Sequence, residues 1–394
     1  MNIEPRTLKG FRDFLPNEAR KRTYVMNALK KVFEAYGFEP LETPVLEYED
    51  ILLGKYGDEG DKLMYRFTDN GQRRVAMRYD QTVPLARVYS QYANELPLPF
   101  KRYQVSNVYR AENTQKGRFR EFLQCDIDTV GADTPLADAE IIETAVLCLQ
   151  NLGFKNFKVL INDRALFEGI PREAITIIDK LKKIGEDGVK KELGEKGLDQ
   201  GLLDKVRGNQ KTERLSQVLE ILQDERVIFD PTLARGLDYY TGIIIEVEIE
   251  GYEAGSVGGG GRYNNLIGMF EEDNVPAVGF AFGFDRLMEA LEQFDLLRIE
   301  PSVAKILVGI FSPEFEKDAY AAAAKLRTRK INVELWLESE AKMEKQIKYA
   351  LKKQIPYMLI IGPEEKEKNM VTIKALSTRE QKMVTIEEVV QMID

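Results

Sequence analysis

The stretch RAENTQKGRFREFLQCDIDTVG, residues 110–131, joins a charged segment to a run in which polar and apolar side chains alternate. If residues 119–129 form a strand, successive side chains point to opposite faces of a sheet. The odd-numbered face is mostly apolar and is expected to pack in a core. The even-numbered face carries Arg120, Phe122, Gln124, Asp126 and Asp128. A solvent-facing side of an antiparallel sheet would explain this pattern, and a binding site is the alternative.

Three other segments favour the binding site. RYDQTVPLAR places Asp80 and Thr82 at the end of a predicted strand, and RGLDYYTG places Arg235 and two tyrosines just before another. GFAFGFDRL places Arg286 behind a third strand, at the start of a predicted helix. A salt bridge or a turn would explain each segment alone. Together they predict a sheet whose polar face binds a ligand.

Length and composition indicate an ordinary globular protein. The chain has 394 residues, 44% of them hydrophobic and 31% charged, which predicts two or three domains. No apolar run approaches the ~20 residues that span a bilayer, and the N-terminus lacks the apolar core of a signal peptide. The two cysteines exclude a disulfide framework. We therefore expect a cytoplasmic protein with no membrane partner.

The chain contains no histidine and has a net charge of −9. Catalytic Ser-His-Asp and Cys-His arrangements are thereby excluded, as are metal sites with His ligands. Cys125 and Cys148 are too few and too far apart in the sequence to hold zinc by themselves, so no zinc is expected. Chemistry that needs mainly charge stabilisation, such as transfer at a phosphate, fits the carboxylates, arginines and tyrosines that remain. The acidic balance argues against non-specific coating of nucleic acid and leaves room for one defined RNA.

The pattern of apolar residues changes along the chain. Residues 19–36 have the spacing of an amphipathic helix. Residues 165–228 are rich in Lys and Glu with helical periodicity, which predicts a small helical insertion. From 304 to 394, apolar strands alternate with helical segments, which is typical of a separate α/β domain.

Five of these motifs together resemble those of the class II aminoacyl-tRNA synthetases. GFRDFLP with the following helix resembles motif 1, the dimer element; YRAENTQKGRFREF resembles motif 2, and GFAFGFDR resembles motif 3. RGLDYYTG and GGGGRYNNL are similar to the two signatures of the histidyl-tRNA synthetase family. The C-terminal segment is similar to that family's anticodon-binding domain. The resemblance covers nearly the whole chain.

The resemblance implies a fold and an activity. The fold is an α+β catalytic domain with an antiparallel sheet of the class II synthetase type, formed by residues 1–164 and 229–300. The insertion at 165–228 interrupts it, and an α/β anticodon-binding domain at 304–394 follows. The family joins L-histidine to ATP, with Mg²⁺, as histidyl-adenylate, and then transfers histidine to the 3′ end of tRNA(His). Motif 1 implies a homodimer.

The resemblance also assigns residues to ATP and to catalysis. Residues matching ATP-binding positions are Arg110, Glu112, Arg118, Phe122 and Arg286. Catalysis is assigned to Arg110, Arg235 and Arg286. A guanidinium suits the α-phosphate because it donates paired hydrogen bonds and stays charged. Arg235 matches an arginine special to this family, which is expected to stabilise charge at the α-phosphate.

Further positions match those that hold histidine. The set is Asp80, Gln81, Thr82, Arg110, Gln124, Asp128, Arg235, Tyr239, Tyr240 and Tyr263. Asp80, Thr82 and Gln124 match positions that hold the α-ammonium group, and Asp128 and Tyr240 match positions that contact the imidazole. Many members carry Glu-Gly-Thr at 80–82 and Glu at 128, where this chain has Asp-Gln-Thr and Asp.

Alternatives remain at the level of sequence. The glycines at 258–261 fit a flexible turn or a close approach of backbone to substrate. The chain as a whole could instead be a synthetase-like regulatory subunit of ATP phosphoribosyltransferase. A third possibility is an inactive synthetase fold that binds RNA. Arg110, Arg235, Arg286 and the C-terminal domain favour the ligase.

Overall fold

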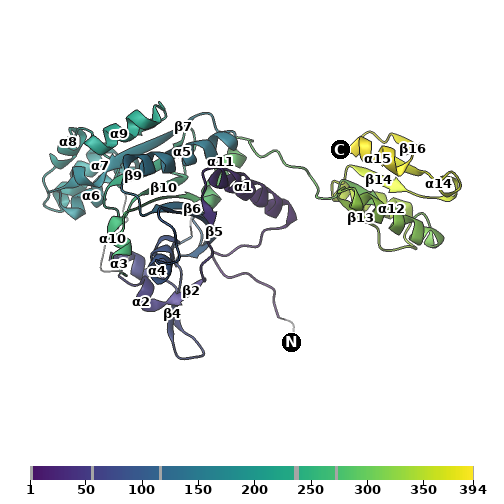
Figure 1. Cartoon of the computed structure of the whole chain (residues 1–394), viewed down its shortest axis with the longest axis horizontal. Helices are drawn as coiled ribbons and strands as arrows, with labels where there is room; N and C mark the ends of the chain where they lie inside the picture. Colours follow the sequence, from purple (N-terminus) through teal and green to yellow (C-terminus); the bar gives the residue numbers. More distant parts are fainter. Residues whose placement is uncertain (1–2, 55–56, 115–117, 235–238, 271–273, 394) are drawn as a thin grey trace. The chain divides into compact units, whose positions relative to one another are not determined.

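The computed structural model describes residues 3–54, 57–114, 118–234, 239–270 and 274–393. The chain divides into two compact units (Figure 1). Unit 1 contains residues 1–14 and 21–297, and unit 2 contains residues 15–20 and 298–394. The domain boundaries given above, including those of the insertion, stay predictions. Within the described ranges, no helix combines the length and apolar character needed to cross a membrane.

The described part of unit 1 contains an eight-stranded sheet with the order β1-β5-β6-β11-β10-β9-β7-β8. The strands are β1 Glu39–Pro40, β5 Phe100–Tyr109, β6 Glu121–Val130, β7 Phe157–Asp163, β8 Val227–Phe229, β9 Ile243–Ile249, β10 Gly258–Arg262 and β11 Ala277–Gly283. All central pairs are antiparallel, which confirms the predicted fold class. The structure adds a parallel pair at each edge, β1 with β5 and β7 with β8.

The two faces of strand β6 differ, because one is apolar and buried in a core and the other is polar. Leu123, Cys125 and Ile127 are buried in the main core with residues of α1 (Pro16–Ala35), α5 (Pro135–Asn151) and α11 (Phe284–Gln293). The predicted apolar face is therefore confirmed. The polar face does not point into open solvent, because Asp126 and Asp128 are each only 3% exposed.

Helix α1 shows how the sequence builds this core. Its buried residues, Val25, Leu29, Val32 and Phe33, recur at the three- and four-residue spacing that aligns side chains on one helix face. Pro16 opens the helix, where its missing N–H costs nothing. The turn after the helix contains Gly37 at a φ of +76°, a conformation that favours glycine.

A second core lies beside the polar face. The described residues here form a three-stranded sheet, β2-β4-β3, with several short helices. These elements are β2 Leu46–Tyr48, β3 Arg66–Thr68, β4 Arg74–Met77, α2 Glu49–Leu52, α3 Gly57–Lys62, α4 Thr82–Tyr92 and α10 Asn264–Ile267. Residues of α4 and α10 pack with Tyr239, Tyr240 and Tyr263 in one cluster. This cluster brings three segments that are distant in sequence to the same end of β6.

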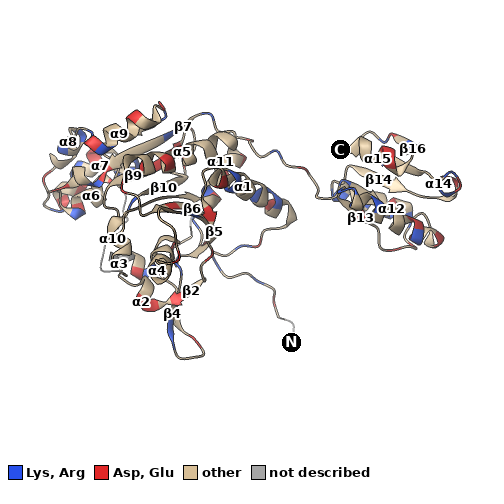
Figure 2. Ribbon diagram, in the orientation of Figure 1, with Lys and Arg blue, Asp and Glu red and all other residues tan. Residues whose placement is uncertain are grey.

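The helices between β7 and β8 lie where the periodicity predicts helices. They are η1 Arg164–Phe167, α6 Arg172–Ile178, α7 Leu181–Glu195, α8 Leu202–Arg207 and α9 Glu213–Leu222. They share a small core that also contains Leu160 and Ile244 of the large sheet. Lys and Arg mingle with Asp and Glu on their surfaces (Figure 2), and Glu186 pairs with both Lys190 and Arg207.

Unit 2 has its own sheet and its own core. Its described strands, in the order β13-β12-β14-β15-β16, are β12 Ile306–Val308, β13 Val333–Leu335, β14 Tyr357–Ile360, β15 Val371–Ala375 and β16 Gln381–Val384. Its helices are η2 Pro313–Phe315, α12 Glu316–Thr328, α13 Met343–Lys352, α14 Pro363–Glu367 and α15 Ile386–Ile393. Every residue of β12 is buried, as expected for a strand with parallel neighbours on both sides.

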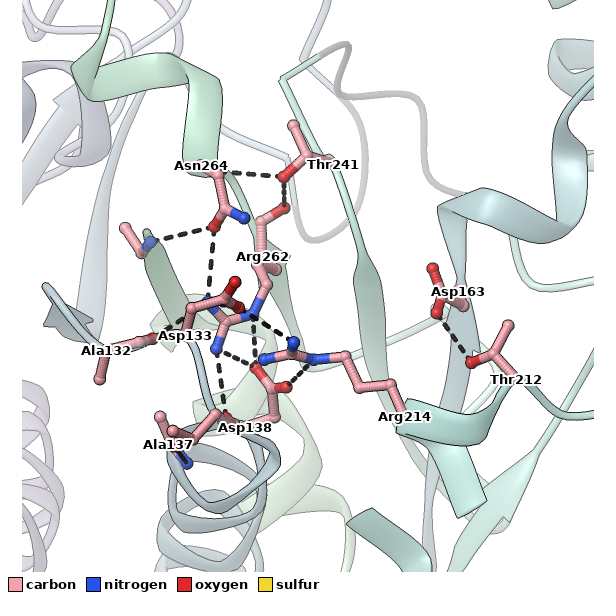
Figure 3. Close-up of polar contacts among 12 residues, drawn as sticks. Ala132, Asp133, Ala137, Asp138, Asp163, Thr212, Arg214, Thr241, Arg262 and Asn264 are labelled. Carbon is pink, nitrogen blue, oxygen red and sulfur yellow. Dashed lines mark hydrogen bonds and ion pairs between the residues drawn. The ribbon is translucent and has the colours of Figure 1, made fainter. Parts of the chain in front are cut away.

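A buried ion-pair network ties α9 and α5 to β10 (Figure 3). Arg262 lies 2.8 Å from Asp138 Oδ1, and Arg214 Nε lies 2.6 Å from Asp138 Oδ2. The Asp138 side chain has no solvent exposure. Burial raises the pKa of Asp138 and the two guanidiniums act against this rise. The position of the β10 end therefore depends on a charge that has no access to water.

Asp138→Ala is expected to destabilise unit 1 by about 3–5 kcal/mol, because it removes the buried counter-charge of Arg262 and leaves only the exposed Asp133, 3.3 Å away. Urea unfolding followed by circular dichroism would measure the loss. Trp336, the single tryptophan, lies in the core of unit 2 and reports on that unit through its fluorescence. Glu195→Ala, which removes an exposed pair with Lys191, is the matched control and should change stability by less than ~1 kcal/mol. Equal effects of the two substitutions would contradict the role of the network.

Candidate active site

A cavity of about 400 Å³ lies on the polar face of the large sheet in unit 1. Its lining includes these predicted site residues: Asp80, Thr82, Arg110, Glu112, Arg118, Phe122, Gln124, Asp128, Tyr239, Tyr240, Tyr263 and Arg286. Gln81 does not line the cavity. Arg235 lies outside the described residues. The sheet thus gathers side chains from segments more than two hundred residues apart in the sequence.

Strands β6, β10 and β11 form the floor of the cavity. Phe122, Gln124, Asp126 and Asp128 line it along the even face of β6. The glycines at 258–261 form part of β10 rather than a turn. A Cβ on Gly260 would lie 2.1 Å from the carbonyl oxygen of Gly279 on β11, so only glycine allows this approach of the two strands. The bare backbone leaves space above the floor.

One end of the floor is built around Asp128. Arg102 lies directly opposite it on β5, and Arg102 Nη2 lies 2.7 Å from Asp128 Oδ2. The Tyr263 hydroxyl donates a short hydrogen bond to Asp128 Oδ1. A Cβ on Gly279 of β11 would lie only 1.9 Å from Asp128 Oδ1. A glycine on the neighbouring strand is therefore a condition for this carboxylate position.

Burial dominates the electrostatics of this end. It raises the pKa of Asp128, and Arg102 and the Tyr263 hydroxyl act against the rise. Asp126 has a pKa well above its ordinary value, chiefly from burial and also from the nearby carboxylates of Asp80 and Asp128. The structure shows no hydrogen-bond partner for Asp126 Oδ1 among the described residues. Burial thus favours the protonated form of Asp126, and Arg102 and Arg110 act against it.

Three tyrosines close the same end. The ring centroids of Tyr239 and Tyr240 are 5.0 Å apart, and those of Tyr239 and Tyr263 are 6.0 Å apart. Burial raises the pKa of Tyr239 and of Tyr263 well above the usual value. Their hydroxyls therefore stay protonated and act as hydrogen-bond donors.

The segment before α4 supplies a further carboxylate. Asp80 Oδ1 accepts hydrogen bonds from the backbone N–H groups of Thr82 and Val83, at 3.0 and 3.1 Å. These bonds fix the side chain at the start of the helix. The Gln81 amide instead donates to backbone carbonyls of Ser106 and Gln124, at 2.9 and 3.2 Å. Gln81 therefore joins the segment before α4 to β5 and β6, and it is not among the residues that line the cavity.

The opposite end of the cavity carries arginines. Arg110 Nε donates to the Tyr79 carbonyl at 3.1 Å, and its guanidinium lies 5.1 Å from the centre of the Phe122 ring. Arg286 Nη1 donates to the Ser256 carbonyl at 3.0 Å. Backbone carbonyls thus orient both guanidiniums, and neither of these contacts uses a carboxylate. An anionic ligand such as a polyphosphate fits this end.

Some residues of the site were not predicted from the sequence. Arg12 stacks on Phe119, 3.2 Å from the ring centre, and pairs with Asp285 at 2.8 Å, and both partners line the cavity. The motif that contains Arg12 was assigned only to dimerisation. Arg102 could have been found by pairing the two predicted strands in register, since it then lies opposite Asp128.

One cavity therefore combines two chemistries. The carboxylates and tyrosines suit an ammonium group and a polar ring, and the arginines suit phosphates. In the described part of the chain, no group of three or more Cys, Asp or Glu residues is placed to hold a metal ion. Glu112 at the arginine end lies 3.5 Å from Arg118, and Asp285 is paired with Arg12. A Mg²⁺ ion at this end would therefore arrive with the phosphates of its nucleotide.

Comparison with known proteins places the chain among synthetases. A family model described as histidyl-tRNA synthetase matches residues 10–184 and 188–287, and a model described as anticodon binding domain matches 305–394. A histidine–tRNA ligase from Wolinella succinogenes is 39% identical, covering 99% of this chain and 98% of the relative. One from Aeropyrum pernix is 38% identical with the same coverage.

Solved structures agree with these relatives. The crystal structure of histidyl-tRNA synthetase from Nostoc sp. PCC 7120 is 30% identical, with a TM-score of 0.86 over 100% of this chain and 99% of that one. A Bacillus halodurans structure titled ATP phosphoribosyltransferase regulatory subunit/histidyl-tRNA synthetase is 23% identical, with a TM-score of 0.72 over 89% of this chain and 97% of that one, and shares the fold. The sequence relatives and the two family models together decide the family: this chain belongs to the histidyl-tRNA synthetases.

Proposed function

We propose that this protein is a histidine–tRNA ligase. It activates L-histidine with MgATP and then esterifies the 3′ end of tRNA(His). The observation that carries the proposal is the single cavity in which Asp80 and Asp128 lie at one end and Arg110 and Arg286 at the other. An amino acid and a nucleotide bound there would meet at their reacting groups.

The first step joins the two substrates. A carboxylate oxygen of histidine attacks the α-phosphorus of ATP, and the bond to the β,γ-phosphates breaks to release pyrophosphate. Arg110 is proposed to hold the α-phosphate and the substrate carboxylate together, and Arg286 to hold the γ-phosphate. Phe122 and Glu112 are proposed to stack on and hydrogen-bond the adenine. No group of the protein has to accept a proton, so the step depends on positioning and charge stabilisation.

The carboxylate end is proposed to recognise the amino acid. Asp80, with Thr82 and Gln124, holds the α-ammonium group, and Asp128 and Tyr240 contact the imidazole. Gln124 and Asp128 lie on the same face of β6, four residues apart, about 13 Å along an extended strand. A site built from such polar groups rejects an apolar analogue by a factor of about 10⁴ or more, because its buried groups would stay unpaired.

The second step transfers the acyl group. The terminal tRNA hydroxyl attacks the carbonyl carbon of the adenylate, and AMP leaves. Unit 2 matches an anticodon-binding domain and is proposed to hold the far end of the tRNA. A homodimer in the cytoplasm is proposed from motif 1 and from the family.

Pyrophosphate–ATP exchange with each of the twenty amino acids, without tRNA, tests the proposal. We expect exchange with histidine alone, because only its ring satisfies the hydrogen-bonding groups around Asp128. A folded, ATP-binding protein that exchanges with no amino acid would instead favour a regulatory subunit. The next experiment would then be a search for a complex with ATP phosphoribosyltransferase.

Arg235→Ala should slow adenylate formation by about 30- to 1000-fold, equivalent to about 2–4 kcal/mol, if Arg235 stabilises charge at the α-phosphate. Single-turnover adenylation by rapid quench measures this step alone. The matched control is Arg207→Ala, which removes an exposed arginine paired with Glu186 on the insertion. An unchanged single-turnover rate in the Arg235 variant would refute its assignment.

Deletion of residues 304–394 should lower the rate of tRNA charging and spare adenylate formation. The reason is that the cavity is lined entirely by residues of unit 1 and the main core of that unit contains no residue of the deleted segment. Exchange and aminoacylation assays on the same preparation give the two rates. An equal loss of both activities would mean that the C-terminal segment mainly supports the fold.

A further inference from the structure

An arginine without solvent exposure lies beside Asp128 at the amino-acid end of the cavity. Arg102 has 0% exposure and pairs with Asp128 at 2.7 Å. Its Nη2 also donates to the Gln81 carbonyl at 3.3 Å. Among the described residues, its Nε and Nη1 have no hydrogen-bond partner. Burying a guanidinium with unused donors costs free energy. This cost suggests that the pairing of Arg102 with Asp128 has a role in the pocket.

Most of the elements packed around Asp128 bring a titratable group close to it. The titratable groups are Arg102 from β5, Asp126 from β6 itself, Asp80 from the segment before α4, Tyr239 from the segment before β9 and Tyr263 from the end of β10. Strand β11 contributes only Gly279, which carries no charge. Arg110 belongs to the arginine end of the cavity and is proposed to face the substrate carboxylate and the phosphate.

The carboxylate that would contact the ring already has a counter-ion. Asp128 is paired with Arg102 inside the protein. Burial raises the pKa values of Tyr239, Tyr263 and Asp126 well above their usual values, which favours the neutral form of each. Asp80 is proposed to hold the α-ammonium group of the amino acid. A cationic ring at Asp128 would therefore compete with Arg102 for one carboxylate.

We propose that Arg102 is a positioning residue that makes the pocket select the neutral imidazole ring of histidine over the imidazolium ion. The inference rests on the proposed function and adds the protonation state of the substrate that the site accepts.

The reason is electrostatic. A protonated ring hydrogen-bonded to Asp128 would share that carboxylate with Arg102, and two cations a few ångströms apart repel strongly where water is excluded. A neutral ring has one N–H donor and one nitrogen acceptor. Asp128 accepts from the N–H group. Tyr240 lines the cavity and carries a hydroxyl donor for the other nitrogen, and Asp126, whose neutral form burial favours, lines it as well.

The unmodified protein allows a direct test by calorimetry. Histidine binding is measured at about pH 6 in two buffers with different ionisation enthalpies, which gives the number of protons exchanged. About three quarters of free imidazole is protonated there, given a pKa near 6.5. We expect release of about 0.7 proton per histidine bound. Binding without proton release would overturn the proposal.

The role of Arg102 is tested by the pH dependence of KM for histidine in the exchange reaction. In the unmodified protein KM should rise about tenfold between about pH 8 and pH 5.5, as neutral histidine becomes scarce. In Arg102→Met this rise should shrink to less than about twofold, because Asp128 without its counter-ion favours the imidazolium. Arg102→Gln should behave like Arg102→Met, and it carries the test if the Met variant does not fold. Arg102→Lys should restore the rise.

Two controls separate this effect from other titrations. Arg87→Met removes an arginine that pairs with Glu47 at 2.8 Å and does not line the cavity, so it should keep the tenfold rise. The analogue 1,2,4-triazole-3-alanine has a ring that stays neutral across this range, so its KM or inhibition constant should stay flat. A tenfold rise that persists in Arg102→Met and Arg102→Gln would overturn the role of Arg102.

The outcomes also separate this proposal from the proposed function. Exchange with histidine at about pH 8 depends only on the ligase activity. An active protein whose KM for histidine is flat with pH would overturn the selection of neutral imidazole and leave the ligase intact. A folded protein with no exchange at any pH would contradict the ligase itself, and calorimetric proton release on histidine binding would still decide whether the pocket selects the neutral ring.

Discussion

The alternation of side chains along β6 is the constraint on which the rest of unit 1 depends. Its odd residues complete the main core, and its even residues form the floor of the cavity. A shift of one residue in the pairing of β6 would exchange the two faces. Burial of Leu123, Cys125 and Ile127 therefore fixes where Gln124 and Asp128 point, so packing and substrate recognition depend on the same register.

Glycines and buried ion pairs also determine the shape of the cavity. Gly260 lets β10 and β11 approach each other closely. Gly279 leaves room for the Asp128 carboxylate on the neighbouring strand. Two buried carboxylates have counter-ions inside the protein: Asp128 is paired with Arg102 on the neighbouring strand, and Asp138 with Arg262 at the end of β10.

Much of this arrangement could be predicted from the sequence, because strand alternation and helix periodicity are local signals. They identified the two faces of β6, the helix before Gly37 and the alternating C-terminal unit. Three-dimensional pairing was less accessible. Nothing local shows that Arg102 lies opposite Asp128, that Gln81 turns away from the cavity, or that Arg12 reaches Phe119. The sequence left the glycines of β10 open between a turn and a close approach of backbone to substrate, because their role depends on the strand beside them.

The pairing of Arg102 with Asp128 also restricts how this pocket can evolve. Many members of the family have glutamate where this chain has Asp128. A glutamate is one methylene longer, and here it would meet Arg102, which lies 2.7 Å from the present carboxylate. Overpacking of a dense interior usually costs about 1–3 kcal/mol. A glutamate at 128 alone gives an overpacked intermediate, and the loss of Arg102 alone leaves Asp128 buried without its counter-ion. The effect of a substitution at one position therefore depends on the residue at the other, and the two are expected to change together between lineages.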